Sequence, residues 1–549
     1  MGGACLGLAY PNSTWIGLAW LGPSIILFSS IGKNGWEAFR LGYAAGMVQS
    51  LITLRWMLNI PYPSGAISGW LALCSYLAVY TGLWVWITWR MFPISTQNGT
   101  SNHITAESIR WFASSTLSQR ALWTFLAATF WVANEMVTSR FLTGFPWMPV
   151  GLTQSSMLSL IQISSLTGIY GVSFIVLWFS VSALASLLSL IQKPLQKHTG
   201  FLSHYAWIGC MALPMLAVGG AMIFGIYRLA NGRSPTSTVR LALVQPSIPQ
   251  TMIWNEKDNQ IRFQKLIELS RLALATDPDV LVWPEAAVPT MLRHDATTAN
   301  TFSALLKQHK SWAIVGSDDA TVGSSGSPQD TRFYNSSFVI NPDGVVQGIY
   351  NKRRLVIFGE YVPLLKWLPF LKYLTPIGQN GFTAGDKPVV FRITIKETKH
   401  SILVSPLICF EDAFPHSVGE YVHEDTDFLL NLTNDGWFGE SNAHWQHAAH
   451  AIFRAVENNI PVVSCANNGL TCWFDSLGRT HQLYFGESKD VYGVGFKNVE
   501  IPILDGEKRA MTFYHAHGDV FGWGCVSILL AALFRHLRQS WFTKKAALQ

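Results

Sequence analysis

The sequence predicts a polytopic α-helical membrane domain combined with an α/β domain on the outer side of the membrane. Long apolar runs occupy residues 1–230 and about 519–538, whereas the segment between them holds most of the acidic residues and alternates short apolar runs with amphipathic ones. At 549 residues the chain exceeds one ordinary domain. We therefore expect membrane helices over 1–230, an α/β domain over 231–512, and a last membrane helix with a cytoplasmic tail over 513–549.

Seven segments have roughly the 20 apolar residues that a membrane-spanning helix needs. They are 14–31, 40–58, 66–90, 121–138, 168–191, 205–229 and 519–537. Residues 230–238, which are rich in small and polar side chains, are expected to link the sixth segment to the α/β domain.

Cationic residues beside these segments predict the orientation of the chain, because short loops rich in Lys and Arg stay in the cytoplasm. All the cationic loops fall on one side of the membrane under a single topology. The large segment between Ala230 and Asp519 then lies outside the cytoplasm. The cations are Lys33, Arg40, Arg90, Arg110, Arg120, Lys193, Lys197, His198, Arg535, Arg538, Lys544 and Lys545.

The composition argues against a nucleic-acid-binding protein. Hydrophobic residues make up 49% of the chain and charged residues 13%, with a formal net charge of +6. The positive charges gather beside membrane segments and form no Lys/Arg-rich face of the kind that contacts phosphates. We therefore expect no nucleic-acid partner.

The middle segment predicts a mixed α/β domain, because strand and helix patterns alternate along it. A hairpin is expected around the Asn-Pro-Asp-Gly turn at 341–344. Helices are predicted at 256–275, 299–309 and 443–457, and strands at 239–245, 280–283, 312–316, 334–340, 345–350, 389–393, 402–408, 428–432, 461–465 and 471–474.

Cys409 stands at the end of an apolar run, 402–408, and before a segment with the mixed composition of a helix start. A thiol at such a junction meets backbone N–H groups and a helix N-terminus, which favour the nucleophilic thiolate. A lone cysteine is more often a small buried hydrophobe. The prediction of a nucleophile therefore depends on two further stretches.

Two other strand ends carry groups that suit acyl transfer. Glu285 follows the apolar run 279–283 and a proline, and Lys352 follows the predicted strand 345–350. A carboxylate can take the thiol proton, and an ammonium can stabilise an oxyanion. We therefore predict that Glu285, Lys352 and Cys409 form a catalytic set.

With these residues in place, the chain resembles the carbon–nitrogen hydrolase (nitrilase) superfamily, whose catalytic set is Glu, Lys and Cys in this order. Within it, the chain resembles the apolipoprotein N-acyltransferases. The match extends over nearly the whole length. It is carried by residues 142–147, 244–250, Trp254, 283–285, 351–352, 358–363, 408–411, 434–439, Arg454 and 467–469.

This resemblance implies an αββα sandwich on the periplasmic side of the bacterial inner membrane. It implies transfer of an acyl chain from a phospholipid, with phosphatidylethanolamine as the expected donor, to the N-terminal diacylglyceryl-cysteine of an apolipoprotein. The transfer would pass through a Cys409 thioester without a cofactor, as the last step of lipoprotein maturation. Residues 1–10 resemble the end of a first membrane helix, so either translation begins upstream or the chain has a short stub there.

Five further residues are supporting candidates. Glu360 is expected either to orient Lys352 or the thiol, or to form a structural ion pair. Glu411 is expected to be a helix-start acid or to hold the pocket together. Trp254 and Trp437 are core residues by default and acyl-chain contacts by resemblance, and Phe410 stands where the family often has Tyr.

Three other features leave alternatives open. The apolar, proline-containing segment 361–376 is predicted to be a membrane-touching arm, with Lys366 and Lys372 at the head groups, rather than a core loop. Cys465 and Cys472 could form a disulfide or stay as buried thiols. A metal site is not expected, since the histidines at 444, 447 and 450 lack a partner ligand.

Two other classes of function compete with acyl transfer. A membrane-tethered amidase or nitrile hydrolase would use the same three residues with water as the acceptor. A non-enzymatic membrane scaffold would keep an inactive hydrolase domain. The apolar arm argues against the first, because a small polar substrate does not need it, and the intact Glu285, Lys352 and Cys409 argue against the second.

Overall fold

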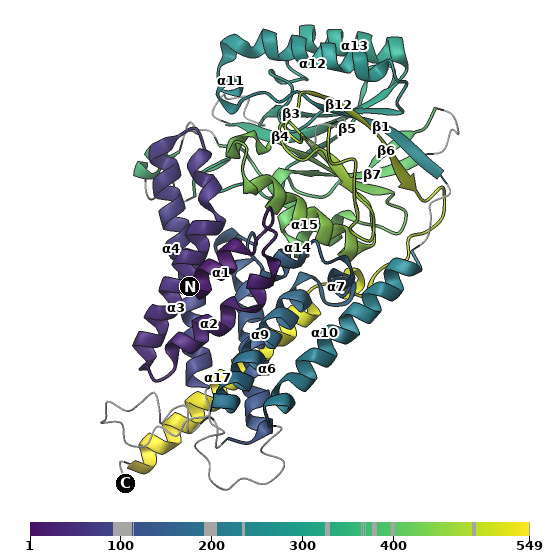
Figure 1. Ribbon diagram of the computed structural model, residues 1–549. Helices are drawn as coiled ribbons and strands as arrows, with labels where there is room; N and C mark the ends of the chain where they lie inside the picture. The colour runs from purple at the N-terminus through teal and green to yellow at the C-terminus, as the bar shows by residue number, and fades with distance from the viewer. Residues whose placement is uncertain are drawn as a thin grey trace. The chain divides into compact units, whose positions relative to one another are not determined.

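A computed structural model of the chain describes residues 1–547 apart from 92–111, 113–114, 192–205, 233–236, 324–329, 364, 366, 368, 376–380, 397–400 and 486–489. The chain folds into a helical unit and an α/β unit (Figure 1). The helical unit consists of Met1–Arg55, Trp70–Ala230 and Ala516–Gln549, and the α/β unit of Trp56–Gly69 and Asn231–His515.

Among the described residues, three helices are long and apolar enough to cross a membrane, and they contain Pro63–Arg90, Ile169–Leu190 and Ile208–Ala230. The helical unit is built from α1 (Gly2–Leu8), α2 (Gly22–Ser30), α3 (Gly35–Thr53), α4 (Pro63–Arg90), α6 (Leu117–Thr138), α7 (Leu158–Ile161), α8 (Ser164–Thr167), α9 (Ile169–Ile191), α10 (Ala206–Ala230) and α17 (Val520–Ala547).

The prediction of one continuous helix over 14–31 was wrong. The segment forms a 3-10 turn, Ile16–Trp20, followed by the nine-residue helix α2. Pro23 stands at the start of α2, where its missing N–H and fixed φ suit a first turn but would interrupt a longer helix. The other six predicted segments overlap α3, α4, α6, α9, α10 and α17.

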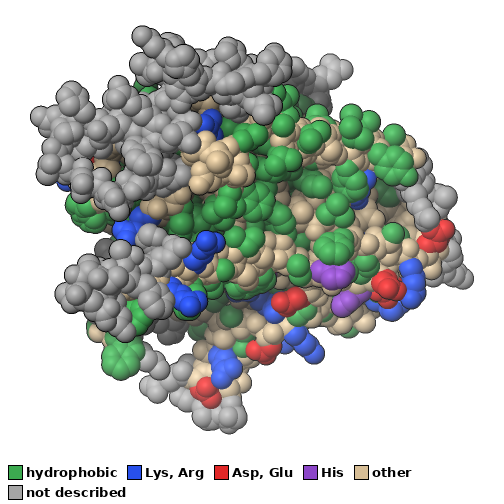
Figure 2. All heavy atoms as spheres, turned by 90° about the horizontal axis from the view of Figure 1, so that it is seen from below, with side chains coloured by type: hydrophobic (Ala, Val, Ile, Leu, Met, Phe, Trp, Pro, Cys, Tyr) green, Lys and Arg blue, Asp and Glu red, His purple; other side chains and the backbone are tan. Residues whose placement is uncertain are grey.

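The surface of α10 suits a lipid environment. Its side chains Leu216 and Ile223 are each 71% exposed, and Met215 is 59% exposed. Figure 2 shows hydrophobic side chains gathered over broad areas of one face of the molecule. An apolar surface of this extent is unusual for a protein in water and is typical of one that contacts a membrane. Of the cations used to predict orientation, Arg110, Lys193, Lys197 and His198 lie outside the described residues.

The α/β unit contains two six-stranded sheets. The first has the order β12-β1-β2-β3-β4-β5 and the second the order β11-β10-β9-β8-β7-β6. The strands are β1 (Ser237–Gln245), β2 (Val280–Val282), β3 (Trp312–Val322), β4 (Thr331–Ile340), β5 (Val346–Asn351), β6 (Phe391–Thr394), β7 (Ser401–Ile408), β8 (Phe428–Thr433), β9 (Val462–Ala466), β10 (Cys472–Phe474), β11 (Thr480–His481) and β12 (Gly495–Ile503).

The sheets and their helices form the expected αββα sandwich (Figure 1). One buried apolar cluster joins inward residues of both sheets, such as Leu241 and Leu407. A second joins the outer face of the first sheet to α12 (Asn259–Leu274) and α13 (Ala296–His309), through residues such as Leu266 and Phe302. On the second sheet, α15 (Asn442–Asn458) contributes Ala451 and Ala455 to the first cluster. Each sheet therefore has a buried inner face and a helix-covered outer face.

The predicted hairpin is confirmed. Strands β4 and β5 pair antiparallel, and the turn between them is closed by bonds from the Gly344 N–H to the Asn341 carbonyl and from the Asn341 N–H to the Val345 carbonyl. Gly344 has a φ of 73°, which a residue without Cβ adopts freely. Strand β12 was missed by the sequence analysis; it contains Pro502, which an edge strand tolerates because its unpaired side needs no N–H.

Candidate active site

Cys409 is placed by the end of β7. This strand runs through the sandwich core, and Cys409 follows directly with a φ of 53°, a left-handed conformation that non-glycine residues rarely adopt. The next segment is a five-residue 3-10 helix, Cys409–Ala413, and the following α-helix, α14, covers only Pro415–Val418. Cys409 thus lies where a buried strand ends and short helical segments begin, and the turn itself positions the thiol.

The environment of Cys409 also corrects the expectation of a resting thiolate. The residue is 9% exposed, and burial raises the pKa of its thiol to about 12. The negative charge of Glu285 raises the pKa further, whereas Lys352 and His447 lower it. Without a full helix dipole, the cations do not outweigh desolvation. At neutral pH the predicted nucleophile is therefore a thiol, which would need a base to react.

This protonation state predicts how Cys409 reacts with a small alkylating reagent. We expect its rate of modification by iodoacetamide to rise about tenfold per pH unit between about pH 7 and pH 9, because the thiolate fraction rises by that factor below the pKa. Peptide mass spectrometry of the Cys409 peptide at timed intervals measures the rate. A plateau beginning below about pH 8 would contradict the raised pKa and restore the thiolate prediction.

Lys352 and Glu285 meet in a buried network at the edge of the first sheet where β2 and β5 end. Glu285 follows β2 by three residues, and Lys352 directly follows β5. Lys352 Nζ donates to Glu285 Oε1 at 3.2 Å and to Glu360 Oε1 at 2.9 Å. All three side chains are buried, Lys352 to 1% exposure. The structure thus brings together Glu285, Lys352 and Glu360, and Glu360 contacts the lysine directly.

Two asparagines that sequence analysis missed complete this network. Asn335 Nδ2 donates to Glu285 Oε1 at 2.7 Å and to Glu360 Oε1 at 2.9 Å. The Asn434 backbone N–H donates to Glu285 Oε2 at 2.8 Å. Glu285 therefore accepts three hydrogen bonds, the pattern of an ionised carboxylate. Asn335 could have been found from the predicted β4–β5 hairpin, because the hairpin brings it opposite Lys352. The Lys352 N–H donates to the Asn335 carbonyl.

The network fixes Lys352 as a cation. Burial by itself lowers the pKa of Lys352, but the charges of Glu285, Glu360 and Cys409 raise it well above its ordinary value. A lysine held charged by two carboxylates cannot act as a base. It can stabilise negative charge on sulfur or on a carbonyl oxygen, and the carboxylate of Glu285 can accept a proton. This division of roles suits attack of a thiol on an acyl carbon.

Glu411 joins the Cys409 turn to the strand that carries Lys352. Its carboxylate accepts from the Ile408 N–H at 2.8 Å, from the Arg353 N–H at 2.7 Å, and from the Tyr350 hydroxyl at 2.7 Å. Burial raises the pKa of Glu411, and these hydrogen bonds oppose that rise. The bond from the Ile408 N–H is that of an acid in the first turn of the Cys409–Ala413 helix, and the bonds from Arg353 and Tyr350 join this turn to the end of β5, so both expected roles of Glu411 stay predictions.

The three aromatic candidates contact other aromatic rings. Trp254 and Trp437 form an edge-to-face pair with ring centroids 5.2 Å apart, and Trp254 is 40% exposed. Phe410 packs edge-to-face on Phe414 at 5.0 Å. The tryptophan pair thus offers an accessible apolar wall, whereas Phe410 makes a packing contact.

The arm that follows Glu360 exposes large apolar side chains. Trp367 is 82% exposed and Phe370 is 59% exposed. Lys366 and the side chain of Lys372, which were expected at lipid head groups, lie outside the described residues. Exposed aromatic side chains of this size are typical of a surface that contacts lipid or a partner.

The structure also describes Cys465 and Cys472, whose pairing was left open, and the side chains that could ligate a metal. Cys465 and Cys472 are free and buried, so the alternative of two thiols describes the pair. Cys465 Sγ donates to the Val244 carbonyl at 3.6 Å. Within the described part of the chain, His, Cys, Asp and Glu side chains form no group with the geometry of a metal site.

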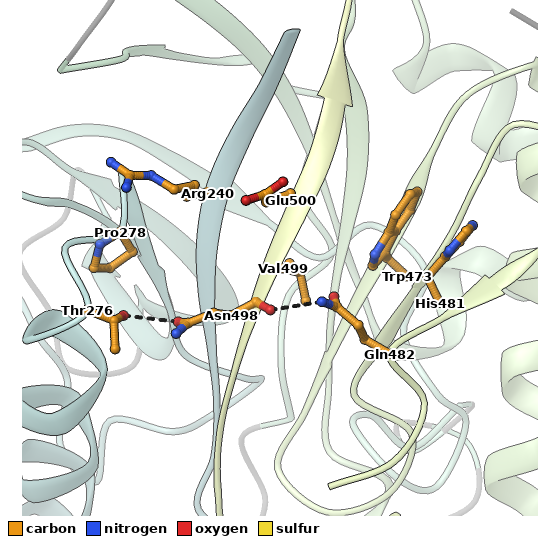
Figure 3. A pocket seen from close by; sticks show the side chains of 9 residues that line it. All are labelled: Arg240, Thr276, Pro278, Trp473, His481, Gln482, Asn498, Val499 and Glu500. Atoms are coloured by element: carbon orange, nitrogen blue, oxygen red, sulfur yellow. Dashed lines mark hydrogen bonds between the residues drawn. The ribbon is translucent and has the colours of Figure 1, made fainter. Parts of the chain in front are cut away.

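A cavity of about 380 Å³ lies away from these residues. Thr276 and Pro278, on its wall, precede β2, whereas Glu285 follows that strand, so the cavity is at the opposite end of the strand (Figure 3). A bond from Thr276 Oγ1 to Asn498 Oδ1 at 3.1 Å crosses it. Its lining consists of Arg240, Thr276, Pro278, Trp473, His481, Gln482, Asn498, Val499 and Glu500.

Two protein families match this sequence. Residues 240–495 match the carbon–nitrogen hydrolase family, a range that contains the second sheet, the first sheet apart from β12 and the start of β1, and the Glu285, Lys352 and Cys409 positions. Residues 2–182 match the apolipoprotein N-acyltransferase N-terminal domain, which covers most of the helical unit.

Full-length relatives join the two regions in one chain. An apolipoprotein N-acyltransferase of Geobacter metallireducens is 30% identical over 548 residues, covering 97% of this chain and 94% of the relative. One of Vibrio parahaemolyticus is 27% identical over 546 residues, covering 96% and 95%. Among solved structures, an amidase from Nesterenkonia is 14% identical with a TM-score of 0.33, covering 50% of this chain and 94% of the amidase.

Proposed function

The chain belongs to the apolipoprotein N-acyltransferase family, and on that premise we propose that it acylates lipoproteins by a two-step transfer through Cys409. The donor is a membrane phospholipid, with phosphatidylethanolamine as the expected one. The acceptor is the free α-amine of an N-terminal diacylglyceryl-cysteine. The observation that carries the proposal is the buried Lys352 held between Glu285 and Glu360 beside a thiol on a strained turn.

In the first half-reaction, Glu285 takes the proton of the Cys409 thiol, and the sulfur attacks the ester carbonyl of the phospholipid. The negative charge that develops on the carbonyl oxygen is stabilised by Lys352 and by backbone N–H groups. The C–O bond then breaks, and Glu285 returns the proton to the departing lyso-phospholipid. The acyl chain remains on Cys409 as a thioester.

In the second half-reaction, the α-amine attacks the thioester carbonyl, with Glu285 as the base that removes its proton. The C–S bond breaks, the sulfur leaves, and the proton held by Glu285 returns to it. The products are an amide on the lipoprotein and the free thiol. Lys352 serves both steps unchanged, because its charge is fixed by two carboxylates.

We propose that the site lies close to the membrane surface, where the lipid substrates of both steps are found. The arm at 361–376 exposes Trp367 and Phe370, and we propose that these side chains enter the outer leaflet. We propose that the α/β unit lies on the periplasmic side of the bacterial inner membrane, an orientation that the positions of the cationic loops support. A phospholipid could then reach Cys409 without leaving the membrane surface.

We expect the purified protein to gain the mass of one acyl chain when incubated with phosphatidylethanolamine. Intact mass spectrometry measures the gain. Adding a synthetic diacylated lipopeptide with a free N-terminal amine is expected to remove the acyl chain and to yield a triacylated peptide. The same lipopeptide with an acetylated N-terminus is the matched control, because it lacks the nucleophilic amine.

The second candidate is a membrane-tethered amidase that uses the same residues with water as the acceptor. It predicts no lasting acyl adduct and release of ammonia from small amides. That result would overturn the proposed transfer. The absence of both signals, in a protein shown to be folded, would favour the scaffold interpretation.

A further inference from the structure

The carbonyl oxygen of Cys409 is anchored by two buried side chains that come from different elements. Asn431, on β8, donates its Nδ2–H to this oxygen at 3.1 Å. His447, on α15, places Nε2 at 3.1 Å from it. Both side chains are almost wholly buried. Because the peptide group of Cys409 is part of the left-handed turn, these contacts bear directly on where its thiol lies.

His447 is enclosed by two aspartates as well. Its Nε2 lies 3.0 Å from Asp412 Oδ1, and its Nδ1 lies 2.9 Å from Asp435 Oδ1. A neutral imidazole has one N–H and one bare nitrogen, whereas an ionised carboxylate can only accept hydrogen bonds. The Nδ1 contact with the Asp435 carboxylate and the Nε2 contact with the Cys409 carbonyl therefore each require an N–H group, because neither oxygen can donate. The contact geometry indicates an imidazolium.

The surrounding charges support this protonation state. Burial lowers the pKa of His447, but Asp412 and Asp435 raise it well above its ordinary value. Asp435 also faces His444, whose Nδ1 is 3.6 Å from Asp435 Oδ2. The charge of His447 acts in turn on Cys409 and lowers the pKa of its thiol. A charged His447 is thus a permanent donor to the Cys409 carbonyl and a second cation near the sulfur.

We propose that His447 is a positioning residue for the nucleophile: clamped by Asp412 and Asp435, it holds the Cys409 carbonyl and thereby keeps the thiol beside Glu285 and Lys352. Its kinetic consequence rests on the proposed acyl transfer. Sequence analysis treated this histidine only as a candidate metal ligand. The contact depends on tertiary structure, since 38 residues separate His447 from Cys409.

Two isosteric substitutions separate the carbonyl contact from the loss of charge. His447→Gln retains an amide N–H at about the place of Nε2, whereas His447→Asn retains one at about the place of Nδ1. Both remove the positive charge. We expect His447→Asn to slow single-turnover acylation by phosphatidylethanolamine about 100-fold and His447→Gln only about tenfold, since small displacements of a reacting group have effects of this size. His450→Gln, on the same helix and equally buried, is the matched control and is expected to stay within about twofold.

A second readout does not depend on acyl transfer. The rate of Cys409 alkylation by iodoacetamide at one alkaline pH is expected to be highest in the wild type, lower in His447→Gln and lowest in His447→Asn. Thermal unfolding confirms that each variant is folded. If His447→Asn does not fold, the comparison of His447→Gln with His450→Gln still tests the inference. If His447→Gln and His447→Asn had the same acylation rate as each other, and the same alkylation rate as each other, the inference would be overturned. The expected alkylation order in a protein that forms no acyl-enzyme would support the positioning role and refute the proposed function instead.

Discussion

Replacing Cys409 with Ala is expected to abolish the acyl-enzyme and to lower acyl transfer by at least about four orders of magnitude, as removal of a catalytic nucleophile does elsewhere. The methyl group of alanine cannot attack an ester carbonyl. Cys409 is the thiol that interacts electrostatically with both Glu285 and Lys352. Intact mass spectrometry after incubation with phosphatidylethanolamine, and release of labelled triacylated lipopeptide, measure the two losses.

Cys472→Ala provides the matched control. Cys472 is fully buried, and its Sγ contacts the Leu470 carbonyl at 3.9 Å, away from the charged network. The control is expected to keep the acyl adduct. An acyl adduct of unchanged yield on Cys409→Ala would show that another residue carries the acyl chain, and the two-step mechanism through Cys409 would then be wrong.

The second large effect is expected from Lys352→Met, which should reduce both activity and stability. We expect the single-turnover acylation rate to fall about 1,000-fold, because the oxyanion loses its cation. We also expect the free energy of unfolding to fall by about 3–5 kcal/mol, because Glu285 and Glu360 would remain buried without their counter-charge. The acylation rate and denaturant unfolding in detergent measure the two effects.

A double variant separates these two consequences. Lys352→Met combined with Glu360→Gln removes one of the uncompensated carboxylates, so it is expected to recover part of the stability but none of the acylation rate. Lys508→Met is the control, since Lys508 forms an exposed ion pair with Glu424 that water screens. If Lys352→Met were as stable as Lys508→Met, the buried charge network would not be the structural feature inferred here.

Much of the candidate site could be predicted because its main residues stand at the ends of predicted strands. Glu285 follows β2, Lys352 follows β5 and Cys409 follows β7. In a sandwich, such strand ends gather at one edge, so local pattern together with residue type indicated a site. Glu360 contacts Lys352 at 2.9 Å, and whether it orients the lysine or forms a structural ion pair stays a prediction.

Other parts of the site followed no local pattern. Asn335 and His447 are ordinary residues of a strand and a helix, and their partners Glu285 and Cys409 stand 50 and 38 residues away. The protonation of Cys409 was predicted wrongly for a related reason. Burial and the number of facing charges set the pKa of a thiol, and neither is visible in the neighbouring sequence.

The sequence by itself determined the division into apolar helices and an α/β domain, the hairpin around Gly344, and the choice of the residues proposed to carry the chemistry. These features follow from periodicity, turn composition and residue type, all of which are local. Only the tertiary structure decided that Glu411 joins Cys409 to the Lys352 strand and that His447 holds the Cys409 carbonyl. The physical reason is that buried polar groups must find partners, and the fold determines which distant groups share a buried site.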